Sequence, residues 1–208
     1  MRIHLPKIYP ITDARLSGLS HAEQVRRLGA GGATLVQLRE KHLSPREFYR
    51  EAEEALRVAR ELGVRLIIND RADIAHALAA DGVHLGQDDL PPAAARATLG
   101  ECAVIGFSTH NEEQAREAIE LPVDYLAIGP IFQTSSKENP DPVVGLEGLR
   151  RVRRIVGQIP LVAIGGIRPE NAREVLRAGA DSVAVISLLL DRGPQEIEGR
   201  TRQILAGL

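Results

Sequence analysis

Eight short apolar runs recur along the chain, and longer segments of mixed polar and apolar residues separate them. The runs span residues 7–12, 34–39, 65–70, 82–86, 103–108, 124–129, 160–165 and 182–187. Most of them are nearly continuous Val, Ile and Leu, without the strict alternation of a strand that has one face in water. This composition is typical of parallel strands that are covered on both faces.

The segments between the runs carry the start and stop signals of helices. Capping-box patterns lie at residues 20–23 and 44–47, where a serine is followed three residues later by glutamate. The first of these segments closes on Gly29 or Gly31 and the second on Gly63, as helix C-termini often do. Further helices are expected over residues 111–120, 168–179 and 193–208.

Eight β-then-α units in 208 residues, without a linker or a shift in composition, predict one (β/α)8 TIM barrel. The expected domain covers residues 1–208. A doubly wound open sheet is the alternative fold. The count of eight runs and the absence of a G-x-G-x-x-G pattern after the first run count against it.

Composition narrows the class of protein. A net charge of −2 argues against a general nucleic-acid or membrane-surface binder, which would carry a basic excess. The N-terminus lacks the apolar run of a signal peptide, and no stretch approaches 18 apolar residues, so we expect a cytoplasmic protein without a membrane span. The single Cys102 is expected to be a buried structural thiol, since apolar residues follow it.

Polar residues gather where the predicted strands end. In a TIM barrel the C-terminal ends of the strands and the loops after them form the active-site face. Eight polar ends around one rim therefore predict a binding or catalytic site there. They are Thr12-Asp13, Arg39-Glu40-Lys41, Asn69-Asp70-Arg71, Gln87-Asp88-Asp89, Ser108-Thr109-His110-Asn111, the 129–145 loop, Gly165-Gly166 and Ser187.

Three cations of this rim, Arg39, Lys41 and Lys137, indicate a bound anion of more than one charge. Lysine is rare in this arginine-rich chain, and Lys7 is the only one away from the predicted rim. Lysine offers a compact, mobile ammonium where arginine offers a flat fork. Chance and codon bias are the alternative explanation of this bias.

Two further groups of residues suggest binding sites on the same rim, one for a metal ion and one for a phosphate. Asp70 and Asp89 offer hard oxygen ligands for Mg²⁺, although either could instead cap the helix that follows it. The Gly165-Gly166 turn and Ser187 occupy positions where barrels commonly bind phosphate; the alternative is a tight turn that requires glycine.

The histidines show no pattern of a catalytic triad. His110 follows Ser108 and Thr109, but nothing nearby makes a Ser-His-Asp arrangement credible. His84 is expected to be a core or rim histidine rather than a base.

Several motifs in order resemble the thiamine phosphate synthase family, also called thiamine-phosphate pyrophosphorylases. The resemblance extends from Tyr9 to Ser187, nearly the whole chain. Each motif alone is weak, but their combination in register is specific. The motifs are YPITD, QLREK, IIND, GVHLGQDDLP, IGFSTHN, DYLAIGPIFQTSSK and IPLVAIGGI.

The resemblance implies a reaction between two small molecules. The pyrimidine of 4-amino-2-methyl-5-hydroxymethylpyrimidine diphosphate is joined to hydroxyethylthiazole phosphate, giving thiamine phosphate and diphosphate. A thiazole that bears a 2-carboxylate also loses CO₂. In this family the diphosphate is thought to leave first, with Mg²⁺ assisting, and the thiazole nitrogen then captures the pyrimidine-methyl cation.

The resemblance also implies roles for individual residues. Asp70 and Asp89 would bind Mg²⁺, and Lys137 would act on the diphosphate. The family loop often reads Thr-x-Thr-Lys, whereas this chain has Ser136 in place of the second threonine and so keeps a hydroxyl. The residues implied to bind substrates are Gln37, Arg39, Lys41, Asn69, Ser108, Thr134, Ser136, Lys137, Gly166, Ile186 and Ser187, and those implied to act in catalysis are Arg39, Lys41, Ser108 and Lys137.

Other functions fit the same fold less well. A thiazole tautomerase would not need the cations of QLREK together with both aspartates. A non-catalytic barrel that binds a phosphate ligand would more readily have lost a metal carboxylate or Lys137, and a barrel enzyme like those of tryptophan biosynthesis is not suggested by these motifs. The long loop over residues 129–145 is expected to act as a lid that orders when ligand binds. The sequence is compatible with a homo-oligomer but does not determine its size.

Overall fold

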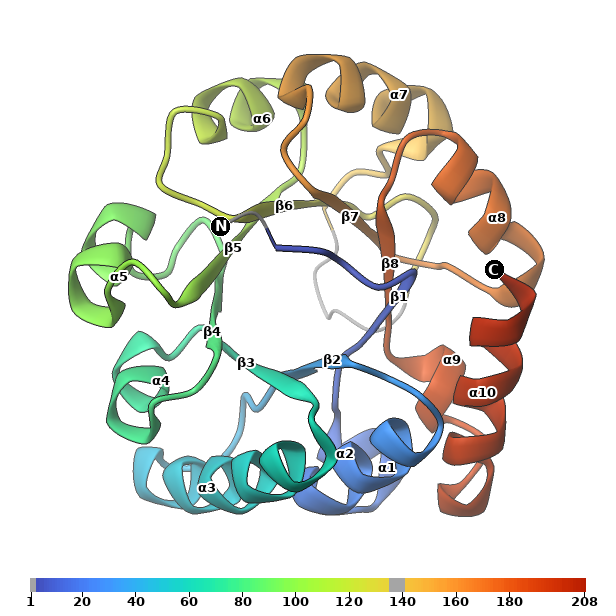
Figure 1. Cartoon of the computed structure of the whole chain (residues 1–208). Coiled ribbons are helices and arrows are strands. Elements are labelled where there is room, and N and C mark those ends of the chain that lie inside the picture. Colours follow the sequence, from blue (N-terminus) through green and yellow to red (C-terminus); the bar gives the residue numbers. More distant parts are fainter. Residues whose placement is uncertain (1–2, 135–140) are drawn as a thin grey trace.

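The chain forms a parallel barrel with helices around its outside (Figure 1). The structure is a computed structural model and describes residues 3–134 and 141–208. One sheet contains all eight strands in the order β1-β8-β7-β6-β5-β4-β3-β2. The strands are β1 (Ile8–Pro10), β2 (Leu35–Leu38), β3 (Arg65–Asn69), β4 (Gly82–Leu85), β5 (Val104–Thr109), β6 (Tyr125–Ile128), β7 (Leu161–Ile164) and β8 (Ser182–Val185).

An isolated parallel bridge between Ile11 and Gln37 joins the two edge strands, β1 and β2. Thr12 N donates to Gln37 O at 2.9 Å beside it. The sheet therefore closes on itself, which confirms the predicted (β/α)8 barrel. Seven of the eight expected runs contain their strands, and these strands end one or two residues earlier than expected. The exception is β5, which ends one residue later, at Thr109.

The helices follow the strands in alternation, as predicted. They are α1 (Ala14–Ser17), α2 (His21–Ala30), α3 (Pro45–Leu62), α4 (Ala72–Leu78), α5 (Pro92–Leu99), α6 (Glu112–Ala118), α7 (Gly145–Val156), α8 (Pro169–Arg177), α9 (Ser187–Leu190) and α10 (Ile197–Gly207), with a 3₁₀ turn over Pro194–Glu196. The Ser44 box is complete, Gly63 ends α3 and Gly31 ends α2, as expected. Ser20 caps α2 by accepting from Glu23 N, but the expected box is incomplete there, because the Glu23 side chain accepts from Arg27 instead. In the described ranges, no helix is both long enough and apolar enough to cross a membrane.

Strand β2 shows how the sequence builds two cores. Its four residues are all buried, and successive side chains of a strand point to opposite faces. Leu35 belongs to the cluster inside the barrel, whereas Val36 and Leu38 belong to the larger cluster between strands and helices. A continuous apolar run is therefore required, because each fully buried leucine contributes about 1.5–3 kcal/mol on either face.

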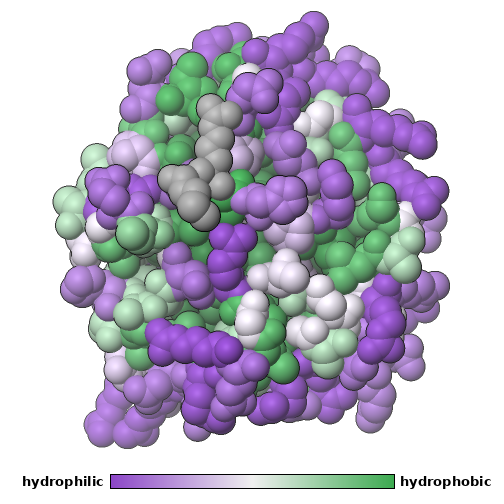
Figure 2. All heavy atoms as spheres, in the orientation of Figure 1, coloured by the Kyte–Doolittle hydropathy of each residue, from purple (hydrophilic) through white to green (hydrophobic). Residues whose placement is uncertain are grey.

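The barrel end at the N-terminal side of the strands is closed by the segment that precedes β1. This segment crosses the opening (Figure 1), and Ile3 and Leu5 are buried in the interior cluster. Figure 2 shows the same face, which is mostly hydrophilic around its edge with smaller apolar areas between. The opposite, C-terminal end of the strands therefore provides access to the barrel interior.

The prediction that Cys102 is a buried structural thiol is wrong, because this residue is exposed. The apolar residues after it do form part of β5, but that strand begins only at Val104. Cys102 lies in the turn before the strand. The apolar residues that follow Cys102 therefore did not show that the strand begins two residues after it, at Val104.

Candidate active site

A cavity of about 1380 Å³ lies at the C-terminal ends of the strands. Predicted site residues from seven of the eight strand ends or following loops line it. They are Gln37, Arg39, Lys41, Asn69, Asp70, Asp89, Ser108, Thr134, Gly166, Ile186 and Ser187. Ser136 and Lys137 lie outside the described residues, as do residues 135–140 of the loop expected to act as a lid.

The end of β2 places two cations on this cavity. Gln37, Arg39 and Lys41 alternate with Leu38 and Glu40, so strand parity carries the first three toward the barrel interior. All three line the cavity. The glutamate is turned away from it and is held by backbone N–H groups of the following residues. The charged end of this strand is therefore part of a site, and the strand does not merely run out into solvent.

Lys41 contacts Asp70 across the tips of β2 and β3, with its ammonium donating to Oδ2 of the aspartate. Asp70 has a φ of 63°, in the left-handed region that asparagine and aspartate tolerate best. It does not cap α4, because Arg71 occupies the N-cap position and no side chain caps that helix. The alternative role of Asp70 as a helix cap is thus wrong.

Asp89 lies beside Asp70 and forms a carboxylate pair with it. Burial raises the pKa of Asp89, and the neighbouring Asp70 raises it further. The hydrogen bond from Gly86 N opposes this shift but does not cancel it. Gly86 N donates to its Oδ2 at 2.6 Å. Pro91 occupies the N-cap of α5, so Asp89 does not cap that helix. Within residues 3–134 and 141–208, no group of three or more His, Cys, Asp or Glu side chains is placed to hold a metal.

The floor of the cavity is a chain of hydrogen bonds across the barrel. Gln37 Nε2 donates to the Tyr9 hydroxyl at 3.4 Å, and this hydroxyl lies 3.0 Å from that of Tyr125. The Tyr125 hydroxyl is 2.9 Å from His84 Nδ1, and His84 Nε2 is 2.9 Å from Ser108 Oγ. Five side chains from five strands thus form one polar surface inside the barrel.

This floor is uncharged at neutral pH. Burial raises the pKa of Tyr9 to about 12 and that of Tyr125 well above its usual value of 10.0. Burial also lowers the pKa of His84 to about 4. The cavity therefore has a neutral, hydrogen-bonding floor beneath a rim that carries charges of both signs. Such a site suits a neutral polar ring attached to an anionic group.

Gly106 makes room for the rings of this floor. It pairs with His84 on one side and with Tyr125 on the other, and these two rings stack at 5.5 Å. A Cβ added at Gly106 would lie 2.1 Å from Tyr125 Cζ. The small residue in the middle of β5 is thus required by the close approach of two aromatic side chains.

Sequence reasoning selected neither Tyr9 nor Tyr125 as a site residue, and it treated His84 as a core or rim histidine. The structure places His84 both in the core and on the cavity. Tyrosine in an apolar strand was the available signal, since a buried hydroxyl usually has a hydrogen-bond partner. That signal does not say which partner, because the partners come from other strands.

The ends of β7 and β8 hold the Gly165-Gly166 turn and Ser187. Both glycines have positive φ, and a Cβ at Gly166 would lie 2.5 Å from Gln133 O. The turn thus requires glycine for its own packing, whether or not it binds phosphate. Ser187 begins the short helix α9 and lines the cavity together with Ile186.

Known proteins resemble the chain over most of its length. A sequence model described as thiamine monophosphate synthase matches residues 8–189. The chain belongs to this family. The thiamine-phosphate synthase of Koribacter versatilis is 51% identical over 211 residues, covering 98% of this chain and 97% of the relative. That of Syntrophomonas wolfei is 48% identical over 198 residues, covering 95% and 93%.

A solved structure of the thiamine monophosphate synthase family has the same fold. It is a thiamine phosphate pyrophosphorylase from Pyrococcus furiosus, 39% identical, with a TM-score of 0.84 and coverage of 96% of this chain and 95% of that chain. The family resemblance of the motifs is thereby confirmed. As a member of the thiamine monophosphate synthase family, the chain is an enzyme of thiamine biosynthesis, a transferase acting on small molecules.

Proposed function

We propose that the chain joins 4-amino-2-methyl-5-(diphosphooxymethyl)pyrimidine to hydroxyethylthiazole phosphate, releasing thiamine phosphate and diphosphate. The observation that carries this proposal is the neutral, hydrogen-bonding floor of the cavity beneath its charged rim. A pyrimidine ring with a diphosphate tail has the same division, with a neutral polar ring at one end and several negative charges at the other. The names of the relatives support the same reaction.

The cations at the end of β2 would bind the diphosphate. Arg39 and Lys41 line the cavity from one strand end, and Lys137 would join them from the loop after β6. Negative charge grows on the diphosphate oxygen as its bond to the pyrimidine methylene breaks. Cations fixed near that oxygen stabilise the transition state more than the bound substrate, so they act on the rate.

Mg²⁺ fits the pair of carboxylates formed by Asp70 and Asp89. The two acids are close enough that the charge of Asp70 contributes to raising the pKa of Asp89, and a divalent cation would relieve this repulsion. Mg²⁺ is commonly bound by one or two carboxylates together with waters and substrate phosphates. When bound, it would add positive charge for the diphosphate oxygens. Lys41 already supplies one positive charge at Asp70.

The floor would hold the pyrimidine by hydrogen bonds without taking a proton from it. Gln37 and Asn69 offer amide groups, and Ser108 offers a hydroxyl already oriented by His84. The low pKa of His84 keeps it neutral in the physiological range. The reaction needs no strong base here, because the nucleophile is a thiazole nitrogen with a free electron pair.

The thiazole phosphate would lie at the ends of β7 and β8. Ser187, Ile186 and Gly166 line that part of the cavity, and β1 separates the end of β8 from Arg39 and Lys41 at the end of β2. The electron pair of the broken C–O bond leaves with diphosphate. The pyrimidine-methyl cation then accepts the electron pair of the thiazole nitrogen, which forms the new C–N bond. A 2-carboxylate on the thiazole would leave as CO₂.

The direct test is incubation of the purified protein with both substrates and Mg²⁺, followed by chromatography of the products. We expect equal amounts of thiamine phosphate and diphosphate. Conversion of a carboxythiazole phosphate into an isomer without the pyrimidine substrate would instead indicate a thiazole tautomerase. Tight binding of both substrates without any product would indicate a non-catalytic phosphate-ligand-binding barrel.

A further inference from the structure

Glu40 lies between two proposed diphosphate-binding cations, and the proposed function gives it no role. Its side chain is only 8% exposed, which is unusual for a glutamate at the end of a strand. Strand parity directs it toward the helices, on the same face as Val36 and Leu38. A buried carboxylate requires hydrogen-bond partners. Those of Glu40 are the His21 ring and the backbone N–H groups of His42 and Leu43.

One carboxylate oxygen of Glu40 fixes the turn that follows β2. Its Oε1 accepts hydrogen bonds from His42 N at 2.6 Å and from Leu43 N at 3.2 Å. Burial alone would raise the pKa of Glu40, but these bonds and the one to His21 lower it overall. The backbone on both sides of Lys41 is therefore held by the side chain of its neighbour.

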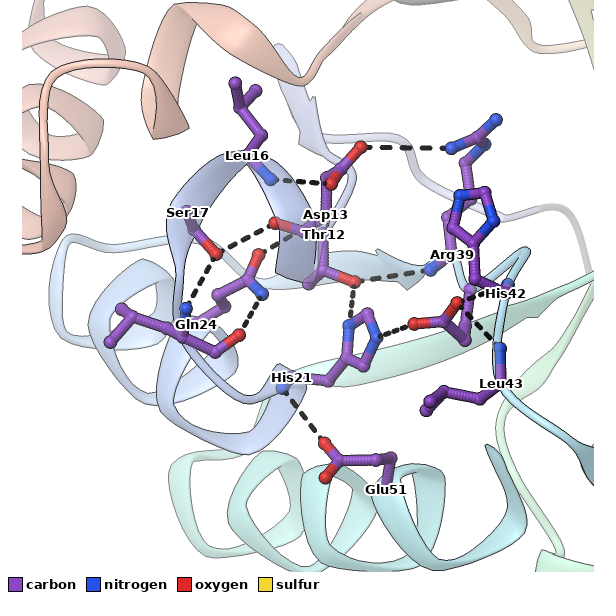
Figure 3. Close-up of polar contacts among 12 residues, drawn as sticks. Thr12, Asp13, Leu16, Ser17, His21, Gln24, Arg39, His42, Leu43 and Glu51 are labelled. Atoms are coloured by element: carbon purple, nitrogen blue, oxygen red, sulfur yellow. Dashed lines mark hydrogen bonds and ion pairs between the residues drawn. The ribbon is translucent and has the colours of Figure 1, made fainter. Parts of the chain in front are cut away.

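The other oxygen reaches a fully buried histidine. Glu40 Oε2 lies 3.2 Å from His21 Nε2, and the side chain of His21 is 1% exposed. His21 Nδ1 lies 2.8 Å from Thr12 Oγ1, which in turn accepts from Arg39 N at 3.2 Å. Figure 3 shows these contacts between the end of β1, the start of α2 and the end of β2.

The donors and acceptors of this arrangement match when the histidine is neutral. Thr12 Oγ1 accepts from Arg39 N, so its own hydrogen is free to be donated to His21 Nδ1. His21 Nε2–H then donates to the Glu40 carboxylate. These hydrogen bonds run from the backbone N–H of Arg39 through Thr12 and His21 to the side chain of Glu40, the next residue in the chain. Together with the peptide bond between Arg39 and Glu40 they form a closed ring at the end of β2.

The same region holds the guanidinium group of Arg39. Its Nη1 lies 4.0 Å from Asp13 Oδ2, and Asp13 N donates to Gln24 Oε1 at 2.9 Å. Asp13 follows Thr12 directly, so the backbone and the side chain of Arg39 are both attached to the same short segment after β1. These contacts leave the cation on the cavity while its strand end stays fixed.

We infer that Thr12, His21 and Glu40 form a positioning network that orients Arg39 and Lys41 toward the diphosphate. The inference rests on the proposed function for the identity of the anion. None of the three network residues lines the cavity, so they are positioning residues and not catalytic ones. Small displacements of a binding group lower activity strongly, by up to about 10²-fold for an error of 1 Å.

The test compares Glu40→Ala with Glu40→Gln. Glutamine keeps an oxygen for His42 N and offers an amide N–H to His21 Nε2, if the imidazole carries its hydrogen on Nδ1 instead. We expect Glu40→Ala to weaken binding of inorganic diphosphate with Mg²⁺ by about tenfold or more, measured by calorimetry. Glu40→Gln should stay near the wild type. The KM for thiazole phosphate should change less than about twofold in both, because its proposed site is at the ends of β7 and β8, which β1 separates from the end of β2.

Asp181→Ala is the matched control for a general loss of stability. Asp181 accepts from Leu161 N at 2.8 Å and pairs with Arg153 at the opposite end of the barrel. This variant should melt at a lower temperature with unchanged affinity for diphosphate. If Glu40→Ala lowers only the melting temperature, or if Asp181→Ala weakens diphosphate binding equally, the inference is wrong.

A variant that keeps Glu40 covers the case in which Glu40→Ala does not fold. Thr12→Val preserves the shape of the side chain and removes only its hydroxyl, so it breaks the network at Arg39 N and His21. Unchanged diphosphate affinity in folded Thr12→Val protein would also overturn the inference. The diphosphate-binding and melting measurements need no turnover. Absence of thiamine phosphate from the wild-type reaction would refute the proposed function but not the effect of the network on diphosphate binding.

Discussion

The ammonium group of Lys41 donates a hydrogen bond to the carboxylate of Asp70, across the tips of neighbouring strands. One of these residues is proposed to bind diphosphate and the other Mg²⁺. Each neutralises the other while no ligand is bound. We expect the arrival of Mg²⁺ at Asp70 to release Lys41 toward the diphosphate, so that the two ligands should bind more tightly together than separately.

Asp70→Asn should lower kcat by roughly 10²-fold or more, because it removes a charged group from the proposed Mg²⁺ site, whose cation would assist diphosphate departure. Asparagine is the suitable substitution, since it also tolerates the φ of 63° observed here. Turnover measured over a range of Mg²⁺ concentrations, with circular dichroism as a folding control, tests this. Full activity of the wild type in excess EDTA would contradict the metal assignment.

Lys41→Met should lower kcat by about 10²-fold and leave the KM for thiazole phosphate nearly unchanged. The reason is that Lys41 faces charge that grows only as the C–O bond breaks. Lys7→Met is the matched control, because Lys7 is an exposed lysine directly before β1, at the far end of the barrel. An unchanged kcat with weaker thiazole binding would reverse the assignment of the two anion sites.

Ser187→Ala should raise the KM for thiazole phosphate by about tenfold with little change in kcat, as expected for one hydrogen bond to a charged group. The phosphate keeps its charge throughout the reaction, so its contacts contribute uniform binding. Steady-state kinetics with varied thiazole phosphate measure this. A lower kcat at saturating thiazole phosphate would speak against a purely binding role for Ser187.

Gly166→Val is less informative for the same site. A side chain there would meet Gln133 O at 2.5 Å and would need a φ of 64°. We expect this variant to lose stability as well as thiazole affinity, because β-branched residues are strained at positive φ. Its melting temperature should fall, which thermal denaturation would detect; an unchanged melting temperature would show that the turn can move aside.

His84 should make folding stability depend on pH between about 4 and 6.5, since burial lowers its pKa to about 4 in the folded protein. In this window the unfolded chain binds a proton that the folded chain refuses, so stability falls as the pH falls. Between pH 7 and 5 the loss from this residue is about 2 kcal/mol.

Urea denaturation at both pH values measures this effect in wild type and His84→Gln. The variant lacks the titrating group, so its free energy of unfolding should fall less on acidification. The contribution of His84 is the loss of unfolding free energy between the two pH values in the wild type minus the same loss in the variant. This subtraction removes the contribution of the other titrating groups. An equal loss in both proteins would mean that His84 is charged in the folded state.

Arg153→Met should lower the free energy of unfolding by about 1–3 kcal/mol with unchanged kinetics, because it leaves carbonyl groups without their donor. Arg153 donates to the carbonyls of Gly179, Gly157 and Ile159 at 2.6, 2.7 and 3.0 Å. The exposed neighbour Arg154 provides the control substitution Arg154→Met. Chemical denaturation measures the effect, and equal values for the two variants would refute it.

The local sequence was sufficient for the elements and for their faces. Largely apolar runs such as residues 34–39 predicted parallel strands buried on both sides, and the parity of Gln37, Arg39 and Lys41 follows from the two-residue period of a strand. Serine caps and glycine stops located α2 and α3. These patterns involve neighbours in the chain, so one sequence is enough to recognise them.

The family motifs added the positions of the site, and every predicted site residue among the described ones lines the same cavity. The roles of these residues remain predictions. The ends of the strands were less accurate, because an apolar or small residue after a strand looks like part of it. Cys102 was misplaced for the corresponding reason at a strand's beginning.

Only the tertiary structure decided which polar side chains meet. Tyr9, His84 and Tyr125 lie on three strands that are far apart in sequence, yet they form one chain of hydrogen bonds. Glu40 likewise depends on His21, nineteen residues earlier. The apolar runs indicate that Tyr9, His84 and Tyr125 lie in strands, whereas the burial of Glu40 and the partners of all these side chains depend on how the barrel closes and on the register of each strand pair. That register is fixed by packing among all eight strands together, and a local pattern does not contain it.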